Sequence, residues 1–196
     1  MKRTITTIST IIALVLPAFA FASTWVIDPE HSNIGFKVRH LMVSNVKGSF
    51  DKYTGTVDIN DKDITKSKVE VTIDTKSINT NVQKRDEHLR SADFFDVAKF
   101  PVMTFVSKKV AKAGNGKLKV TGDLTLHGVT KEVVLDVEGL SQAIKDPWGN
   151  IRRGATASTK INRKDFGLVW NKALETGGVV VGDEITITLE IEMVKK

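Results

Sequence analysis

Histidines are the first residues in this chain that could do chemistry. The four imidazoles belong to His31, His40, His88 and His127. No two of them are spaced i, i+2 or i, i+4, so no single strand or helix would present two imidazoles on one face. A zinc site would have to be assembled from distant parts of the chain, and we expect no metal site.

His40 occupies the most informative position of the four. It follows Ile34, Phe36 and Val38 at alternate positions, so strand parity places it on an apolar face. It could be a barrel-end histidine bonded to the backbone, or a polar contact to a ligand headgroup at the barrel mouth. In an alternative function, an enzyme acting on a small apolar or lipid substrate, His40 would be the acid–base.

A cluster of ionisable residues lies in a segment that predicts a short helix, roughly Val82 to Ser91, capped by Thr80 or Asn81. One interpretation is a solvated helix with local ion pairs. The other is a lid or rim over a barrel opening, with Arg85 or His88 turned toward a polar headgroup. A guanidinium suits phosphate or carbonyl oxygens.

Common catalytic signatures are missing. The sequence has no G-x-S-x-G motif, and its paired glycines lack the strand–helix context of a phosphate loop. The absence of cysteine excludes disulfides, thiolate metal sites and cysteine nucleophiles. These absences favour a binding protein over an enzyme.

The N-terminus is typical of a secretion signal. Lys2 and Arg3 precede an apolar run that ends near Pro17, and Ala20-Phe21-Ala22 is an A-x-A cleavage signature. We expect residues 1–22 to be a signal peptide, with a cut after Ala20 as a second possibility and an uncleaved anchor as the rival interpretation. The mature domain, residues 23–196, would then be exported, most simply to a bacterial periplasm, with no stable membrane insertion.

The charge balance is mildly basic. Removing Lys2 and Arg3 lowers the formal net charge from +6 to +4, and the remaining lysines are spread along polar faces. We therefore expect no nucleic-acid partner. Slight attraction to anionic lipid headgroups stays open.

Alternation of apolar and polar residues dominates the rest of the chain. Trp25-Val26-Ile27 opens the mature chain, Asp28-Pro29 breaks it, and a turn is expected near Ser44-Asn45. Eight segments follow the period of a strand. They are centred on Ile34–His40, Tyr53–Ile59, Val69–Asp74, Met103–Phe105, Leu118–Leu126, Val133–Glu138, Arg152–Ile161 and Ile185–Met193.

Eight such strands predict an all-β fold, an antiparallel barrel with a short helical insertion between strands three and four. The small residues of the seventh segment would leave room inside. An open two-sheet sandwich would produce the same alternation. An edge-paired homodimer is possible.

Several motifs together resemble the YceI-like family. They are His40-Leu41 with Gly48-Ser49-Phe50, Arg85–Phe95 with Phe100-Pro101, Gly122–Thr130, Asp146-Pro147-Trp148-Gly149, and Asn162–Gly167. The matches occur in order over essentially the whole mature chain. The resemblance implies an eight-stranded lipocalin-like barrel with an internal apolar tunnel, and carriage of a lipid without catalysis.

The same resemblance suggests the cargo and where it would lie. Family members are associated with polyisoprenoid-type lipids, so we expect an amphiphilic lipid partner such as a polyprenyl phosphate or an isoprenoid quinone, and no other cofactor. We expect His40, Arg85 and His88 at the mouth. The residues expected to line the tunnel are Phe36, Val38, Val71, Met103, Phe105, Leu124, Leu135, Trp148, Phe166, Trp170 and Ile187.

Besides the lipid carrier and the enzyme, a third hypothesis is a stress or adhesion module whose barrel is a filled core.

Overall fold

The computed structural model describes residues 23–175 and 177–196, so the expected signal peptide over residues 1–22 lies outside the described residues. One helix, α1, spans Gln83–Arg90. The strands are β1 Ser23–Ile27, β2 Asn33–His40, β3 Ser44–Phe50, β4 Tyr53–Ile59, β5 Lys68–Asp74, β6 Ile78–Asn79, β7 Val102–Lys112, β8 Leu118–Leu126, β9 Val129–Glu138, β10 Ile144–Lys145, β11 Ile151–Asn162 and β12 Val181–Lys195. Short 3₁₀ turns cover Ile64–Lys66, Thr75–Ser77 and Arg163–Phe166.

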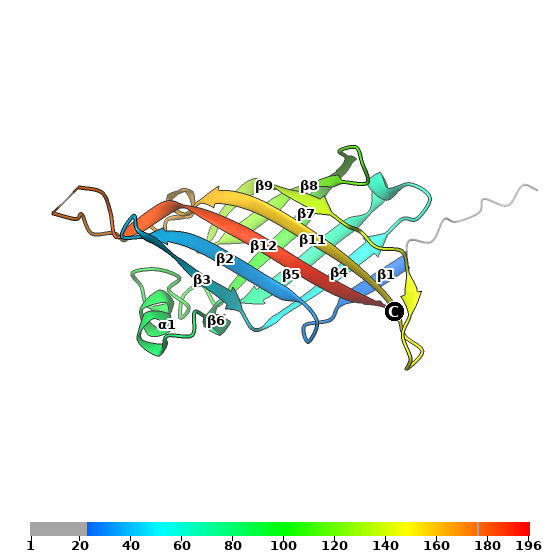
Figure 1. Ribbon diagram of the computed structural model, residues 1–196, viewed down its shortest axis with the longest axis horizontal. Coiled ribbons are helices and arrows are strands. Elements are labelled where there is room, and N and C mark those ends of the chain that lie inside the picture. Colours follow the sequence, from blue (N-terminus) through cyan, green and yellow to red (C-terminus); the bar gives the residue numbers. More distant parts are fainter. Residues whose placement is uncertain (1–22, 176) are drawn as a thin grey trace, which may run out of the picture.

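The strands form a closed eight-stranded antiparallel barrel (Figure 1). Its ring runs β1, β4, β5, β7, β8, β9, β11 and β12, and the pairing of β12 with both β11 and β1 closes it. This closure confirms the predicted barrel and rules out the open sandwich. Helix α1 lies between β5 and β7 in the chain, as the predicted insertion required.

Part of the barrel wall is built from interrupted strands. Along one edge of β12, residues Ile185–Glu190 pair with β2 and residues Met193–Lys195 pair with β1. The next position in the wall is also shared by two strands. There β3 pairs with β2, and β4 pairs with β1. Asp28-Pro29 interrupts the first of these positions, where the sequence predicted a break.

Two local expectations from the sequence differ from the structure. The turn after β2 lies at residues 41–43 and not at Ser44-Asn45, where β3 begins. The predicted caps Thr80 and Asn81 also fail, because the N-cap of α1 is Val82, without a side-chain bond. The Thr80 hydroxyl instead donates to the buried Asp86 carboxylate, and this bond ties the segment before α1 to the helix.

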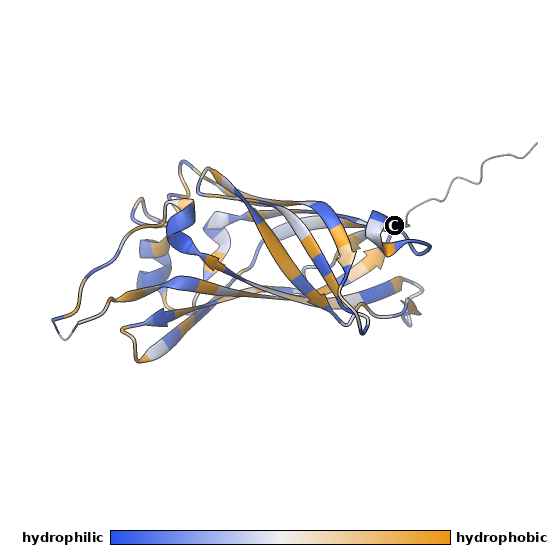
Figure 2. Ribbon diagram, turned by 90° about the horizontal axis from the view of Figure 1, so that it is seen from above, coloured by the Kyte–Doolittle hydropathy of each residue, from blue (hydrophilic) through white to orange (hydrophobic). Residues whose placement is uncertain are grey.

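The barrel has two distinct ends. Helix α1, the β2–β3 turn and the β11–β12 loop lie at one end, which we call the helix end; β1, β10 and the C-terminus lie at the other, the terminal end (Figure 1). Coloured by hydropathy, the strands alternate between hydrophobic and hydrophilic residues along their length (Figure 2). That alternation turns one face of each strand into the barrel.

Candidate functional site

The barrel encloses an elongated apolar cavity of about 280 Å³. Its lining runs from Val110 and Leu118 near the terminal end to Val38 and Val181 at the helix end. Nearly all lining side chains are aliphatic or aromatic, with Ser67, Thr156 and Thr159 as hydroxyl groups. This volume is near the lower limit of about 300 Å³ for ligand pockets, so the space suits a narrow, chain-like ligand.

The small residues of β11 help to create this space. Ala155, Ala157 and Thr159 line the cavity on the inner face of that strand, as their size predicted. Directly across the β11–β12 pairing, Ile191, Leu189 and Ile187 also face inward.

Eight of the residues expected to line a tunnel do line the cavity. They are Phe36, Val38, Val71, Met103, Phe105, Leu124, Leu135 and Ile187. All eight lie on strands, where parity fixes the direction of each side chain.

The three other residues expected in the lining do not line the cavity. The Trp148 side chain is 82% exposed on the β10–β11 hairpin, because Asp146 accepts bonds from the backbone of Trp148 and Asn150 and holds this loop outside the barrel. Phe166 is buried in a 3₁₀ turn that contacts β9 and β11, and Trp170 packs on His88. None of the three lies within a strand, so parity gave no guide to its direction.

The three residues expected at the mouth lie around the helix end without lining the cavity. His40 ends β2, opposite Ser44 and Val181. The Arg85 guanidinium donates to the hydroxyl and carbonyl oxygens of Thr80 at 2.8 and 3.0 Å, which fixes the chain before α1.

His88 contributes indirectly to the cavity wall. Its Nε2 lies 2.8 Å from an Asp93 carboxylate oxygen, and its ring packs edge-on against Phe94 and Trp170 with centroids 5.0 and 4.9 Å apart. Phe94 lines the cavity, together with Leu89 from α1 and Phe95. The helix and the segment after it therefore cover the helix end with apolar side chains, whereas Arg85 and His88, which the lid interpretation turned toward a headgroup, do not line the cavity.

Sequence reasoning missed Arg163, the one charged residue among the described residues that line the cavity. Its side chain is only 3% exposed. Every second residue of β11 points into the barrel, namely Ala157, Thr159 and Ile161. The next residue in this alternation is Arg163, directly after the strand ends. Extending the alternation by one step past the strand would have identified it.

The Arg163 guanidinium is held almost entirely by backbone carbonyl oxygens. Nε donates to Gly182 at 2.9 Å, and one terminal nitrogen donates to Leu168 and Trp170. The other terminal nitrogen has only long contacts of 3.4 Å, to Val181 and to the Asp183 carboxylate. Burial lowers the pKa of Arg163, and the negative charge of Asp183 opposes that shift.

The terminal end is closed by a tight apolar cluster. Trp25, Ile59 and Met193 are 1%, 2% and 3% exposed, and the Arg153 guanidinium lies over the Trp25 ring at 5.2 Å. The inward residues Val38 and Val181 at the helix end are only half-buried. Leu118 and Val137, which line the cavity toward the terminal end, are half-buried as well.

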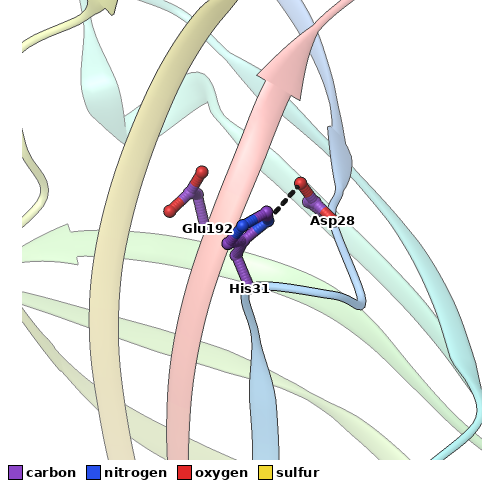
Figure 3. Close-up of side chains that lie close together, drawn as sticks. All are labelled: Asp28, His31 and Glu192. Carbon is purple, nitrogen blue, oxygen red and sulfur yellow. Dashed lines mark hydrogen bonds and ion pairs between the residues drawn. The ribbon is translucent and has the colours of Figure 1, made fainter. Parts of the chain in front are cut away.

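A second polar cluster lies on the outside of the terminal end. Asp28, His31 and Glu192 bring their ligand atoms within 4.8 Å of one another (Figure 3). The Arg152 guanidinium already donates to Asp28 at 2.7 Å, to Glu192 at 2.6 Å and to Asp146 at 2.7 Å. Because this cation already occupies an oxygen of each of these carboxylates, the cluster is organised as an ion-pair network.

The charges of this network shift the pKa values of its members. The hydrogen bond from Arg152 lowers the pKa of Asp28 to about 2 and holds the pKa of Asp146 far below its usual range. The hydrogen bond to Asp28 raises the pKa of His31. The network ties the β1–β2 break to β11 and β12.

The described part of the chain contains no helix long and apolar enough to cross a bilayer.

Comparisons with known proteins agree with this architecture. A UPF0312 protein of Vibrio parahaemolyticus is 45% identical over 168 residues, covering 85% of this chain and 88% of the relative. The crystal structure of the Campylobacter jejuni YCEI protein is 39% identical, with a TM-score of 0.68 over 86% of this chain and 96% of that one. A polyisoprenoid binding domain from Saccharophagus degradans, 18% identical, shares the fold with a TM-score of 0.64 over 90% of this chain and 99% of its own.

A family model adds the decisive match. The model described as the YceI-like domain matches residues 25–193, which is nearly all of the described chain. The ordered motifs in the sequence predicted this assignment. The chain belongs to the YceI-like family.

Proposed function

We propose that this protein binds one long-chain amphiphilic lipid in the cavity and carries it through the periplasm. The observation that supports the proposal most strongly is the elongated apolar cavity of about 280 Å³ inside a closed barrel. Burying a hydrocarbon chain there contributes roughly 25 cal/mol per Å² of apolar surface, less the cost of ordering the chain. The secretion signal expected over residues 1–22 is the sequence feature that supports the location.

The ligand class we propose is an isoprenoid lipid with a polar headgroup. The Saccharophagus degradans domain of the same fold is described as polyisoprenoid binding, and we extend that class to this chain. The headgroup would lie near the helix end, where Arg163 brings a buried positive charge to the cavity wall. That charge favours a phosphate over an alcohol or a quinone.

The alternative of an enzyme with His40 as acid–base has less support. The His40 imidazole is not part of the cavity lining, so it would not contact a bound lipid chain. A filled core is a poor description of a barrel that contains this cavity.

A pair of substitutions on one strand tests the lipid site. Phe105 points into the cavity, and its neighbour Val106 is 46% exposed on the outer face of β7. Phe105→Trp should narrow the cavity and weaken uptake of geranylgeranyl phosphate about tenfold, whereas Val106→Trp should leave uptake unchanged. Native mass spectrometry of the loaded protein measures both. Equal uptake by the two variants would count against this lining.

The natural cargo can be identified directly. Protein purified from its own periplasm should release a long-chain lipid into organic solvent, which mass spectrometry would identify. An extract free of lipid, from protein that also fails to bind added prenyl lipids, would refute the carrier function.

A further inference from the structure

The turn between β2 and β3 exposes consecutive apolar side chains. Leu41, Met42 and Val43 are 38%, 49% and 76% exposed. Single exposed apolar residues are ordinary, but tight turns usually use glycine, asparagine or aspartate. We call Leu41–Val43 the apolar tip; it lies at the helix end (Figure 1).

The backbone of the apolar tip is constrained to display these side chains. Leu41 and Met42 have φ angles of 49° and 60°, a left-handed conformation that favours glycine or asparagine over bulky residues. The Arg39 guanidinium donates to the Met42 carbonyl at 2.8 Å, and the Leu41 amide donates to the Val180 carbonyl at 2.8 Å. Surrounding contacts therefore hold a strained turn whose apolar side chains face water, a combination that points to a function.

The β2–β3 ribbon behind the tip is basic. Lys37 and Lys47 face each other directly across the two strands, and such like-charge pairs are unfavourable in a sheet. Arg39 adds a third cation, and residues 33–50 contain no acidic residue. The nearest carboxylates on β12, Asp183 and Glu184, pair with other cations. The ribbon therefore presents a positive charge that an anionic surface would compensate.

The apolar tip is continuous with the cavity wall. His40, immediately before the tip, pairs with Val181, and both Val181 and Val38 line the cavity. A Cβ on Gly178 in the β11–β12 loop would lie 3.3 Å from the Met42 side chain, and Val169 in the same loop is 63% exposed. A flat surface that receives the tip would therefore also lie close to the helix end of the cavity.

We propose that the apolar tip and the basic β2–β3 ribbon dock the barrel on the anionic surface of a lipid bilayer, with the helix end facing the membrane. Aliphatic side chains would enter the interfacial region while Lys37, Arg39 and Lys47 contact the headgroups. Protein interfaces instead favour aromatic residues and are depleted in lysine, so this chemistry fits a bilayer better than a protein partner.

Vesicle co-sedimentation tests the docking surface. Wild-type protein should bind phosphatidylglycerol/phosphatidylethanolamine vesicles, bind phosphatidylcholine vesicles weakly, and detach as salt is raised. Val43→Asp and the double variant Lys37→Gln/Lys47→Gln should each reduce binding about tenfold. Trp148→Ser is the matched control, because Trp148 is also exposed but lies on the β10–β11 hairpin, at the terminal end of the barrel, and its binding should be unchanged.

The other outcomes overturn the proposal. These are wild-type protein that ignores anionic vesicles, a loss of binding in Trp148→Ser equal to that in Val43→Asp, and a dimer in sedimentation velocity that Val43→Asp dissociates, which would make the tip an interface between copies. Uptake of geranylgeranyl phosphate in solution should be the same for Val43→Asp and wild type. That measurement separates a failure of docking from a failure of the lipid site or of folding.

Discussion

Arg163 places a positive charge in a cavity lining that is otherwise uncharged among the described residues. Its contacts to backbone carbonyls orient the guanidinium without neutralising it, and the nearest carboxylate oxygen, from Asp183, is 3.4 Å away. A buried cation is unfavourable unless it is paired, and an anionic ligand would add a second negative charge to the long pair with Asp183. The Asp183 side chain is 41% exposed, so it can be changed without disturbing the core.

Asp183→Asn should therefore strengthen binding of geranylgeranyl phosphate a few-fold and leave geranylgeraniol unaffected. Removing this carboxylate raises the positive potential at Arg163, and only a charged headgroup responds to it. Competitive displacement of a fluorescent prenyl lipid gives both affinities. Glu184→Gln is the control, because its partner is Lys160 on the outer face. An identical change for the phosphate and the alcohol would remove Arg163 from headgroup recognition.

The Arg152 network makes a prediction about pH. The pKa of Asp28 is lowered from 3.8 to about 2, so its stabilising contribution is complete above about pH 4 and is lost as the pH falls toward 2. The raised pKa of His31 acts in the other direction, contributing below its usual value of 6.5 and fading as the pH rises through the folded value. Stability should therefore be greatest between these two limits.

Arg152→Gln should lower the free energy of unfolding at pH 6 and flatten its decline between pH 4 and pH 2. The variant leaves Asp28 and Asp146 without their main cation, so their pKa values return toward ordinary values. Urea titrations across this pH range measure both effects. Lys160→Gln, which breaks a solvent-exposed pair with Glu184, should change neither. A parallel acid profile in the two variants would contradict this assignment.

At the scale of elements, alternation predicted the strands that follow it without interruption. β3 was missed as a separate strand because Gly48 occupies an inward position and breaks the apolar pattern between Val46 and Phe50. In the structure, a Cβ on Gly48 would lie 2.5 Å from the Phe36 ring of the neighbouring strand. The glycine makes room for that ring, a relation between strands that a single segment cannot reveal.

Side-chain direction could not be predicted from the sequence for residues in loops and at the ends of elements. Trp148 and Trp170 were placed by their loop contexts, but loops have no parity, and their direction depends on bonds such as those to Asp146. The position of α1 in the chain was predictable from its polar, glycine-free composition. Its role as a cover depended on where Leu89 and Phe94 would point, which only the closed barrel determines.

The contact between Gly48 and Phe36 predicts a packing effect. Gly48→Ala should destabilise the protein by about 1–3 kcal/mol, because the new methyl group also approaches the Asn79 carbonyl oxygen at 2.8 Å. Gly154→Ala is the control: its Cβ would meet nothing closer than 3.5 Å, so stability should stay level or rise slightly. Urea denaturation compares the two. Adding Phe36→Leu to Gly48→Ala should restore part of the loss, and equal stability of the two single alanine variants would refute the packing argument.

At the scale of the whole molecule, the barrel is a container with unequal ends. The cluster around Trp25 closes the terminal end, while helix α1 and its following segment cover the helix end with side chains that belong to shorter, less regular elements. At two positions of the wall, two successive strands (β1 with β2, and β4 with β3) together span the distance between the ends.

This container predicts that stabilisation by a lipid should grow with chain length. Each isoprene unit adds buried apolar surface until the cavity of about 280 Å³ is filled, so affinity should rise from geranyl to geranylgeranyl phosphate and then level off. At one fixed lipid concentration, about 100 times the Kd of the geranylgeranyl ligand, that ligand adds roughly 2.7 kcal/mol and raises Tm by about 5–10 °C in a domain of this size, and the shorter, weaker ligand adds less. Differential scanning calorimetry measures the shift. Phe105→Trp should reduce it more for the longer chain than for the shorter, because the long chain needs the narrowed space. An equal shift from inorganic phosphate would mean that the headgroup alone stabilises the barrel.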